Sequence, residues 1–596
     1  MSKSLLFLMA ILSLAYFNME ANANSRERVN RQQSMVKMQE GVNYSQSNVF
    51  NSKQITPEGY RGGDAYVIRP EVVTSITGYY DWQTNGACPH FVNYVSPTII
   101  HAIEMIATDS TDLSGSRRTD YSFSSDGGAT WGATNTVPNI RSGFPTLTVG
   151  TTGASQDVAI IGNHYQPGSY LLGGCHVDAF PGLGSFTSYP YPGTVSNFIW
   201  PQLTTLTNGN VMVSAETYQG AAATDTGYVV VFDPNAGTWA GSSQLFVSSA
   251  NSQLNMRWAS ATGPGGKAIY VLDALNDTGD PLAGNRIFYY TTSDNGATWS
   301  AENVLWETNI TGADTNFAWL GIDACYDNAG NFYVVWNTTS TTFSQTKLWV
   351  SKNGGTPEMV CQMTDIPGGI TSMVTAMGNA SGLDWPTIAV SADGNYVMTG
   401  YSACMQDDTL NGFNSYDLYY SVSPTSALSF SAPRQITSGM DDERYVSFNR
   451  VTTTDGSSNE ILAMTYMKDP QPGSCAFNDN APVSRNHLIY REIENPQTSI
   501  HNVSGEIPGT YRLLQNYPNP FNPSTMIRFE LPKNINVTLK VYDITGKEVA
   551  TLLNNQTLTA GVKEFDFNGA NLGSGIYFYT LQAGDFKETK KMVLVK

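Results

Sequence analysis

Aromatic residues recur at intervals of about sixty residues in the middle of the chain, and at three of them a charged residue stands directly before the ring, as in Arg257-Trp258, Asp384-Trp385 and Glu443-Arg444-Tyr445. Aromatic faces pack against sugar C–H groups, and charged side chains fix hydroxyl groups. This pattern predicts a saccharide or peptide site, and the candidate ligand-binding residues are Trp200, Arg257, Trp258, Trp319, Asp384, Trp385, Glu443, Arg444 and Tyr445.

The same aromatic residues mark a repeated segment. An apolar residue follows each start by three positions, and successive starts lie 48 to 66 residues apart, at Ser96, Phe144, Trp200, Trp258, Trp319, Trp385 and Tyr445. Several starts are followed by a Gly/Asn turn and two further apolar runs, which is typical of strands joined by hairpins. We expect an all-β fold: a β-propeller over residues 61–496, with seven blades, or six if the segment near 66–75 only closes the ring.

In a propeller the innermost strand of every blade begins near one rim of the central channel, so the aromatic residues are expected to surround that channel. The wide spacing also predicts long loops on one face. A second interpretation stays open, because large side chains at equivalent positions are often wedges that pack one blade against the next.

The N-terminus has the pattern of an export signal. Lys3 precedes an apolar run over 5–17, and Ala21-Asn22-Ala23 ends it, so residues 1–23 are expected to be a signal peptide rather than a membrane span. Residues 24–60 are polar, without apolar periodicity, and are predicted to form a flexible arm. A net charge of −18 argues against nucleic acid and membrane surfaces as partners.

Two turns share the pattern Ser/Thr-x-Asp-x-Gly-x-Thr-Trp. Their residues are Ser124, Asp126, Gly128, Thr130 and Trp131, and Thr292, Asp294, Gly296, Thr298 and Trp299. The carboxylate caps backbone N–H groups of its own turn and the Trp folds back over it. These turns resemble the Asp-box of BNR-repeat, sialidase-like propellers. The resemblance implies structural turns between the outer strands of a blade, away from the central pocket.

The same resemblance implies a second class of function, a sialidase-like glycoside hydrolase or another carbohydrate-active enzyme. A sialidase needs three Arg for the substrate carboxylate and a Tyr–Glu nucleophile pair. Ile68-Arg69-Pro70 departs in order from the Arg-Ile-Pro element of that family. Arg257, Arg444 and Arg450 are further candidates, and Glu443 lies near Tyr445. Catalytic residues therefore stay unassigned.

The last part of the chain predicts a separate small Ig-like sandwich over 511–596, after a linker over 497–510. Its motifs are LLQNYPNPFNPST at 513–525, KVYDITGKEV at 540–549, LGSGIYFYTL at 572–581 and the terminal KKMVLVK. They resemble the type A C-terminal sorting domain of type IX secretion cargo in the Bacteroidetes and related bacteria. The resemblance implies a partner, the type IX secretion machinery, and a location outside the cell or on the outer-membrane surface.

No cofactor or metal is expected. The six Cys (Cys88, Cys175, Cys325, Cys361, Cys404 and Cys475) show no zinc-type spacing, and their disulfide pairing stays open. The His, including His90, His101, His164 and His176, form no H-x-H or H-x-x-x-H pair. Two functions remain: a secreted or surface propeller that binds an extracellular glycan or protein, or the carbohydrate-active enzyme above.

Overall fold

The computed structural model describes residues 66–84, 90–153, 155–168, 171–192, 198–217, 226–247, 254–275, 285–307, 317–339, 345–371, 380–426, 428–455, 459–476, 481–497, 500–504, 507–522, 524–569 and 572–595. The expected signal peptide and arm lie outside these ranges. The described elements are β-strands and two short 3₁₀ turns, η2 (Pro264–Gly266) and η3 (Met363–Asp365). The expected all-β class is confirmed.

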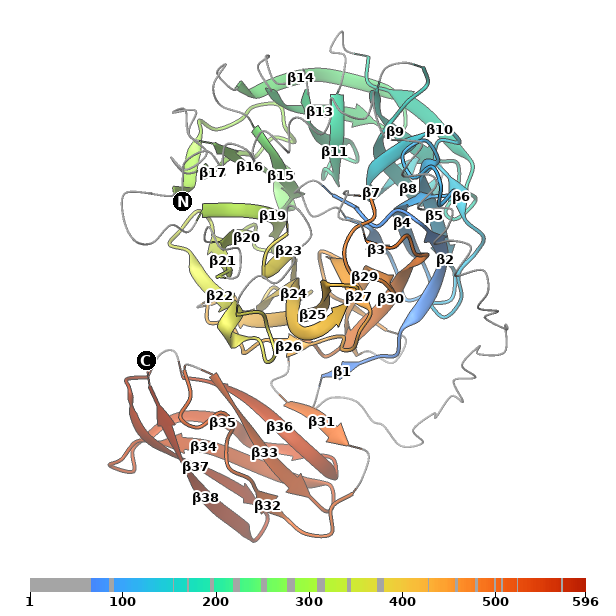
Figure 1. The fold of residues 1–596 in the computed structure, drawn as a ribbon. Coiled ribbons are helices and arrows are strands. Elements are labelled where there is room, and N and C mark those ends of the chain that lie inside the picture. The colour runs from blue at the N-terminus through green and yellow to red at the C-terminus, as the bar shows by residue number, and fades with distance from the viewer. Residues whose placement is uncertain are drawn as a thin grey trace, which may run out of the picture.

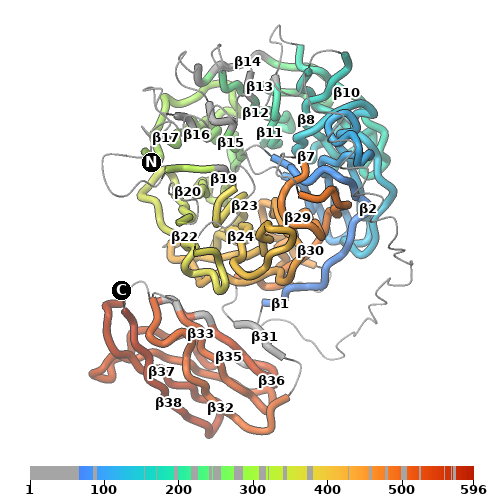
Figure 2. The backbone as a smooth tube through the Cα atoms, in the orientation of Figure 1, coloured from blue at the N-terminus to red at the C-terminus, as the bar shows by residue number. Residues whose placement is uncertain are grey.

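The strands between Val67 and Glu494 form seven sheets, which follow one another around a ring in Figure 1. Figure 2 shows the chain passing from sheet to sheet around this ring in sequence order. The first three sheets are β3 (Val92–Tyr94), β4 (Ile100–Ala107), β5 (Arg117–Ser124) and β6 (Asn135–Thr136); β7 (Ser142–Thr152), β8 (Ser155–Tyr165), β9 (Leu172–Asp178) and β10 (Phe186–Pro190); and β11 (Phe198–Thr205), β12 (Val211–Thr217), β13 (Thr226–Asp233) and β14 (Thr238–Val247).

The next three sheets repeat this four-strand order. They are β15 (Leu254–Thr262), β16 (Ala268–Leu275), β17 (Asn285–Thr292) and β18 (Asn303–Glu307); β19 (Phe317–Tyr326), β20 (Phe332–Thr339), β21 (Lys347–Lys352) and β22 (Glu358–Gln362); and β23 (Leu383–Val390), β24 (Tyr396–Leu410), β25 (Phe413–Pro424) and β26 (Arg434–Gln435). We call these sheets blades 1 to 6.

Blade 7 joins the two ends of the propeller. It contains β27 (Asp442–Phe448), β28 (Thr453–Thr454), β29 (Glu460–Asp469) and β30 (Asn486–Glu494), and the early strands β1 (Val67–Ile68) and β2 (Val72–Gly78) pair with β30. Pairing the first strands with the last sheet closes the ring without leaving a long free edge.

Each blade packs its apolar face against its neighbours. One cluster joins Met212 and Val229 of blade 3 to Tyr270 and Leu272 of blade 4. Another joins Met398 of blade 6 to Met464 of blade 7. Side chains alternate between the two faces of a strand. Each face of a blade that is covered by a neighbouring blade is therefore apolar.

The innermost strands carry a β-bulge near the aromatic position. In blades 2 to 7 the register between the first and second strand shifts there, for instance between Asp384 and Thr387. Four of the aromatic residues have left-handed backbone conformations: Phe144 (φ 51°), Trp200 (φ 50°), Trp385 (φ 48°) and Tyr445 (φ 58°). Bulges re-aim side chains, and such φ values are unusual for bulky residues, so this conformation is a repeated feature of the fold.

The two Asp turns have the geometry expected from their residues. Asp126 Oδ1 accepts hydrogen bonds from Thr130 N (2.9 Å) and Ser124 Oγ (2.9 Å), and Trp131 Nε1 donates to Gly128 O (3.2 Å). In the second turn Asp294 Oδ1 accepts from Thr298 N (2.9 Å). The turns connect β5 to β6 and β17 to β18, the outer strands of blades 1 and 4.

The C-terminal domain has two four-stranded sheets. One orders β31 (Ile500–Ser504), β36 (Gly561–Asn568), β33 (Ser524–Leu531) and β32 (Arg512–Leu513); the other orders β35 (Glu548–Leu558), β34 (Ile535–Tyr542), β37 (Gly575–Ala583) and β38 (Phe586–Leu594). Residues from both sheets, such as Phe529 and Leu539, share one core. The linker prediction differs from the structure here, because part of 497–510 is the strand β31, which pairs with β36.

Candidate ligand site at the upper end of the propeller

The antiparallel order of strands separates the two ends of the propeller. We call the end at which the innermost strands begin the upper end. Asp384 and Arg444 lie in the first residues of β23 and β27 and therefore at this end. The Asp turns follow the third strand of their blades, which runs in the same direction as the first, so they lie at the lower end.

The aromatic positions divide into two groups by exposure. Trp200, Trp258, Trp385 and Tyr445 are buried, with exposures of 1 to 7%. Trp385, for example, packs on Tyr445 with ring centres 4.5 Å apart. These four rings pack between blades, as the wedge interpretation expects. Phe144 and Trp319 are only half-buried.

Trp319 is joined to Arg257 of the preceding blade. The Arg257 guanidinium lies 5.1 Å from the Trp319 ring centre, and it donates to the Trp319 carbonyl and to Asp273 Oδ2 (3.1 Å). Arg257 is 5% exposed. Cation–π contact and ion pair together hold the indole ring in place.

Asp384 is a fully buried acid near this group. Ser381 N and Oγ and Asn337 Nδ2 donate to its carboxylate, the last two at 2.7 and 2.8 Å. Burial raises the pKa of Asp384 to about 6, although these hydrogen bonds and Arg257 act in the opposite direction. Its carboxylate oxygens thus accept hydrogen bonds from donors within the propeller.

Glu443 and Arg444 point to opposite sides of β27, because neighbouring strand residues alternate. Arg444 is fully buried, with its guanidinium 5.6 Å from the Tyr445 ring centre and its Nε 3.2 Å from Asp442 Oδ2. Glu443 lies on the other face, 3.4 Å from Lys468 Nζ. Burial raises the pKa of Glu443 to about 9, against the effect of Lys468. The structure therefore separates these two sequence neighbours.

A further group at the upper end combines Arg117 of β5 with Tyr80, Phe144 and His164. The Arg117 guanidinium lies 5.5 Å from the Tyr80 ring centre and 5.2 Å from that of Phe144. Its Nη1 is 3.3 Å from Tyr80 Oη, and its Nη2 is 3.5 Å from His164 Nε2. This group could not be predicted from the sequence, because Arg117 lies in blade 1, Phe144 and His164 lie in blade 2, and Tyr80 follows β2, so its members share no local motif.

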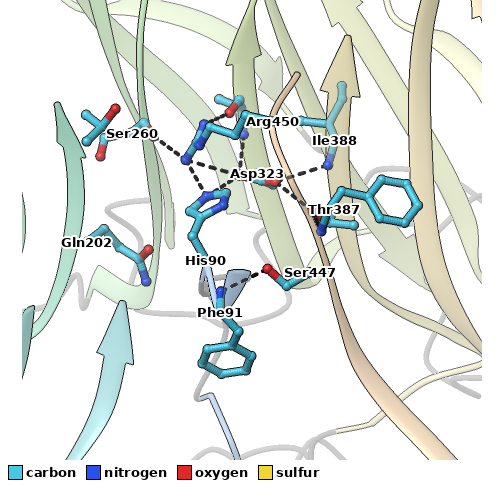
Figure 3. Close-up of polar contacts among 12 residues, drawn as sticks. His90, Phe91, Gln202, Ser260, Asp323, Thr387, Ile388, Ser447 and Arg450 are labelled. Atoms are coloured by element: carbon cyan, nitrogen blue, oxygen red, sulfur yellow. Dashed lines mark hydrogen bonds and ion pairs between the residues drawn. The ribbon is translucent and has the colours of Figure 1, made fainter. Parts of the chain in front are cut away.

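Figure 3 shows a separate network of polar contacts around His90, Asp323 and Arg450. Arg450 donates to Ser260 O (2.7 Å) and Ala324 O, and contacts His90 Nε2. Asp323 Oδ1 lies 3.2 Å from the same nitrogen, and Asp323 Oδ2 accepts from Ile388 N (3.0 Å). Residues from blades 4 to 6 are thus tied to His90 and Arg450 in the middle of the ring.

The charges in this network support one another. Burial raises the pKa of Asp323, but His90 and Arg450 outweigh it and hold the pKa below its ordinary value. Burial and the Arg450 charge lower the pKa of His90, against the effect of Asp323. The Asp323 carboxylate, 3.8 Å from Arg450 Nη2, therefore compensates the charge of the Arg450 guanidinium at the hub. We assign this network to holding the hub together.

The arginines considered for a sialidase-type cluster each bind a different set of partners. Arg69 sits beside β30 and pairs with Asp455 (2.5 Å), Glu492 (2.5 Å) and Glu494 (2.9 Å). Arg257, Arg444 and Arg450 are bound to Asp273, Asp442 and the hub network, respectively.

The described ranges were compared with the sequence expectations for metal sites, cysteines and membrane spans. No group of three or more His, Cys, Asp or Glu has a metal-binding arrangement there. Cys175, Cys325, Cys361, Cys404 and Cys475 are free thiols, and Cys88 lies outside the described residues. None of the described helical segments is long and apolar enough to cross a membrane.

Comparison with known proteins identifies the C-terminal domain. Residues 515–596 match the family model for the secretion system C-terminal sorting domain. This domain is a type IX sorting domain. The predicted secretion route is thereby confirmed, and the chain is a protein secreted from the cell or attached to its outer surface. No curated protein matches the chain in sequence.

Solved structures similar to the chain include three carbohydrate-active proteins. A PL25 ulvan lyase bound to -[GlcA(1-4)Rha3S]- is 11% identical, covers 68% of this chain and 97% of its own, and has a TM-score of 0.44. An α-L-arabinanase of Penicillium chrysogenum is 12% identical (61% and 100% covered, TM-score 0.38). The Fusarium graminearum α-L-arabinofuranosidase Arb93A is 9% identical (58% and 91% covered, TM-score 0.36).

Proposed function

We propose that this exported propeller binds an extracellular glycan at its upper end. One observation carries the proposal. Two half-buried aromatic rings at that end, Phe144 and Trp319, each have a guanidinium on one face, 5.2 Å away for Arg117 and 5.1 Å away for Arg257. The two rings occupy the same position in the innermost strands of blades 2 and 5.

Such a ring has the properties that a sugar site needs. The guanidinium fixes the orientation of the ring before any ligand arrives, which lowers the entropy lost on binding. An accessible aromatic surface then packs against sugar C–H groups, while nearby polar side chains bind hydroxyl groups. The sorting domain supports this proposal, because it delivers the propeller to the outside of the cell.

Binding is favoured over hydrolysis by the state of the carboxyl groups. A glycosidase generally places two carboxyl groups on either side of the scissile bond. Asp384 and Asp442 at the upper end are fully buried, and they accept hydrogen bonds from Ser381 and from Tyr416 N (3.0 Å). These carboxylates serve the fold, so the carbohydrate-active enzyme is the second candidate.

The experiment compares two half-buried tryptophans at opposite ends of the propeller. The full exported protein and its Trp319→Ala and Trp299→Ala variants are titrated with a panel of soluble plant, algal and animal polysaccharides. We expect Trp319→Ala to weaken binding about tenfold, or about 1.4 kcal/mol. Trp299→Ala, in the lower Asp turn, is expected to leave binding unchanged.

Two results would contradict the proposal. Equal affinities of the wild type and Trp319→Ala for every bound polysaccharide would remove the upper-end site. New reducing or unsaturated sugar ends released by the wild type would show an enzyme and make the second candidate the correct one.

A further inference from the structure

The arginines at the upper end differ in how their charge is compensated. Arg257 lies 3.1 Å from Asp273 and Arg444 lies 3.2 Å from Asp442. Arg117 has no carboxylate within ion-pair distance among the residues that the structure describes, although it is only 8% exposed. A buried cation without a counter-charge is costly, and in proteins such a group usually has a partner.

The groups that contact Arg117 in the described part of the chain are neutral. Its guanidinium lies 5.5 Å from the Tyr80 ring centre and 5.2 Å from that of Phe144, and its hydrogen-bonding neighbours are Tyr80 Oη and His164 Nε2. Because His164 Nε2 faces an obligate donor, the neutral imidazole carries its proton on Nδ1. His164 Nδ1 and Arg117 Nε are buried and have no hydrogen-bond partner among the described residues. Two donors therefore lack acceptors within one group.

Gly143 makes room for this arrangement. It pairs with His164 across β7 and β8. A Cβ atom at this position would lie 2.9 Å from Arg117 Nε and 2.5 Å from Met105 Sδ. The sequence thus keeps a glycine where a side chain would displace the guanidinium.

The electrostatic state of His164 fits a positive site. Burial lowers the pKa of His164 well below its ordinary value, and the charges of Arg117 and Arg141 lower it further. A second positive charge is thereby kept out of the group, and the local charge at neutral pH comes from arginine alone.

We infer that Arg117 and His164 bind the anionic group of an acidic saccharide, a carboxylate or a sulfate ester. This inference rests on the proposed glycan-binding function and names the class of its ligand. The two flanking rings restrain the guanidinium plane, and a planar fork of N–H donors is well suited to carboxylate and sulfate oxygens.

The test uses D-glucuronate and D-glucose, which differ in the carboxylate at C6, with inorganic sulfate as a third probe. The full exported protein is titrated with each by calorimetry. We expect glucuronate to bind at least tenfold more tightly than glucose, and sulfate to compete with glucuronate. Arg117→Gln is expected to abolish the preference. Arg118→Gln is the matched control, since Arg118 is the next residue of β5 and donates to Gly115 O and Arg117 O.

Each outcome decides between the two proposals. Equal binding of glucuronate and glucose by the wild type, which needs no variant to fold, overturns the anion site. A preference that persists in Arg117→Gln does the same, even if polysaccharide binding still depends on Trp319. A preference that depends on Arg117, combined with no polysaccharide binding at all, supports the anion site and overturns the glycan proposal.

Discussion

At the scale of single residues, most of the charged side chains described above form ion pairs or hydrogen bonds within the propeller. Arg69, Arg444 and Arg450 are held by several acceptors each, and the acids Asp323 and Asp384 accept hydrogen bonds from residues of other strands. Arg117 and Glu104 depart from this rule. Buried polar groups without partners are uncommon in native proteins, and each one calls for a physical reason.

Glu104 allows a prediction of pH dependence. It is fully buried on β4, and neither carboxylate oxygen has a hydrogen-bond partner in the described part of the chain. Burial, then Asp120 and Asp469, raise its pKa well above the ordinary value. Above about pH 4.5 the folded chain thus holds a proton that the unfolded chain has lost. This contribution is complete at low pH and is lost as pH rises through the folded pKa.

Glu104→Gln removes this titration. The variant is expected to be more stable than the wild type at pH 8 by about 1–3 kcal/mol, and the difference should shrink toward pH 4.5. Urea unfolding at the two pH values measures it, and the exposed Glu358→Gln serves as control. A variant that is less stable at pH 8 would show that the Glu104 carboxylate has a partner that favours its charge.

At the scale of the strand, one bulge serves two purposes. It occurs near the aromatic position of the innermost strands of blades 2 to 7. In blades 3, 4, 6 and 7 the ring is buried against its neighbours, whereas in blades 2 and 5 it stays half-buried beside an arginine. The same backbone feature therefore gives packing wedges in some blades and candidate ligand contacts in others.

This division predicts different stability losses for two equivalent tryptophans. Trp385→Ala removes a ring that is 1% exposed and packs on Tyr445 and Tyr416. It is expected to cost about 3–5 kcal/mol. Trp319→Ala is expected to cost less than half as much, because its ring is only half-buried. Equal losses in urea unfolding would contradict the assignment of Trp385 to packing and Trp319 to binding.

The strands also show which features the sequence could predict and which it could not. The repeat predicted the sheets and the position of the aromatic residues, since periodic patterns follow from strand geometry. It did not tell a wedge from an accessible ring, because exposure depends on the neighbouring blade. The grouping of Tyr80, Arg117 and His164 was not predictable for the same reason. Arg117 and His164 lie in the sheets of blades 1 and 2, Tyr80 follows β2, and the three meet only in the folded ring.

At the scale of the whole molecule, the chain combines a closed ring with a sorting domain. β1 and β2 complete the last blade, so the two ends of the propeller sequence meet in one sheet. The sorting domain was predictable from its motifs, which are local in sequence, and its family match confirms it. The linker was less predictable, because the strand β31 is defined by its pairing with β36 rather than by its composition.

The most direct test of the glycan-binding account is the crystal structure of the full exported protein with an acidic oligosaccharide taken from a polysaccharide that it binds. The account predicts a sugar ring in contact with Trp319 or Phe144 and an anionic group within hydrogen-bond distance of Arg117. An oligosaccharide bound at the lower Asp turns, or on the C-terminal sandwich with the upper end empty, would contradict it.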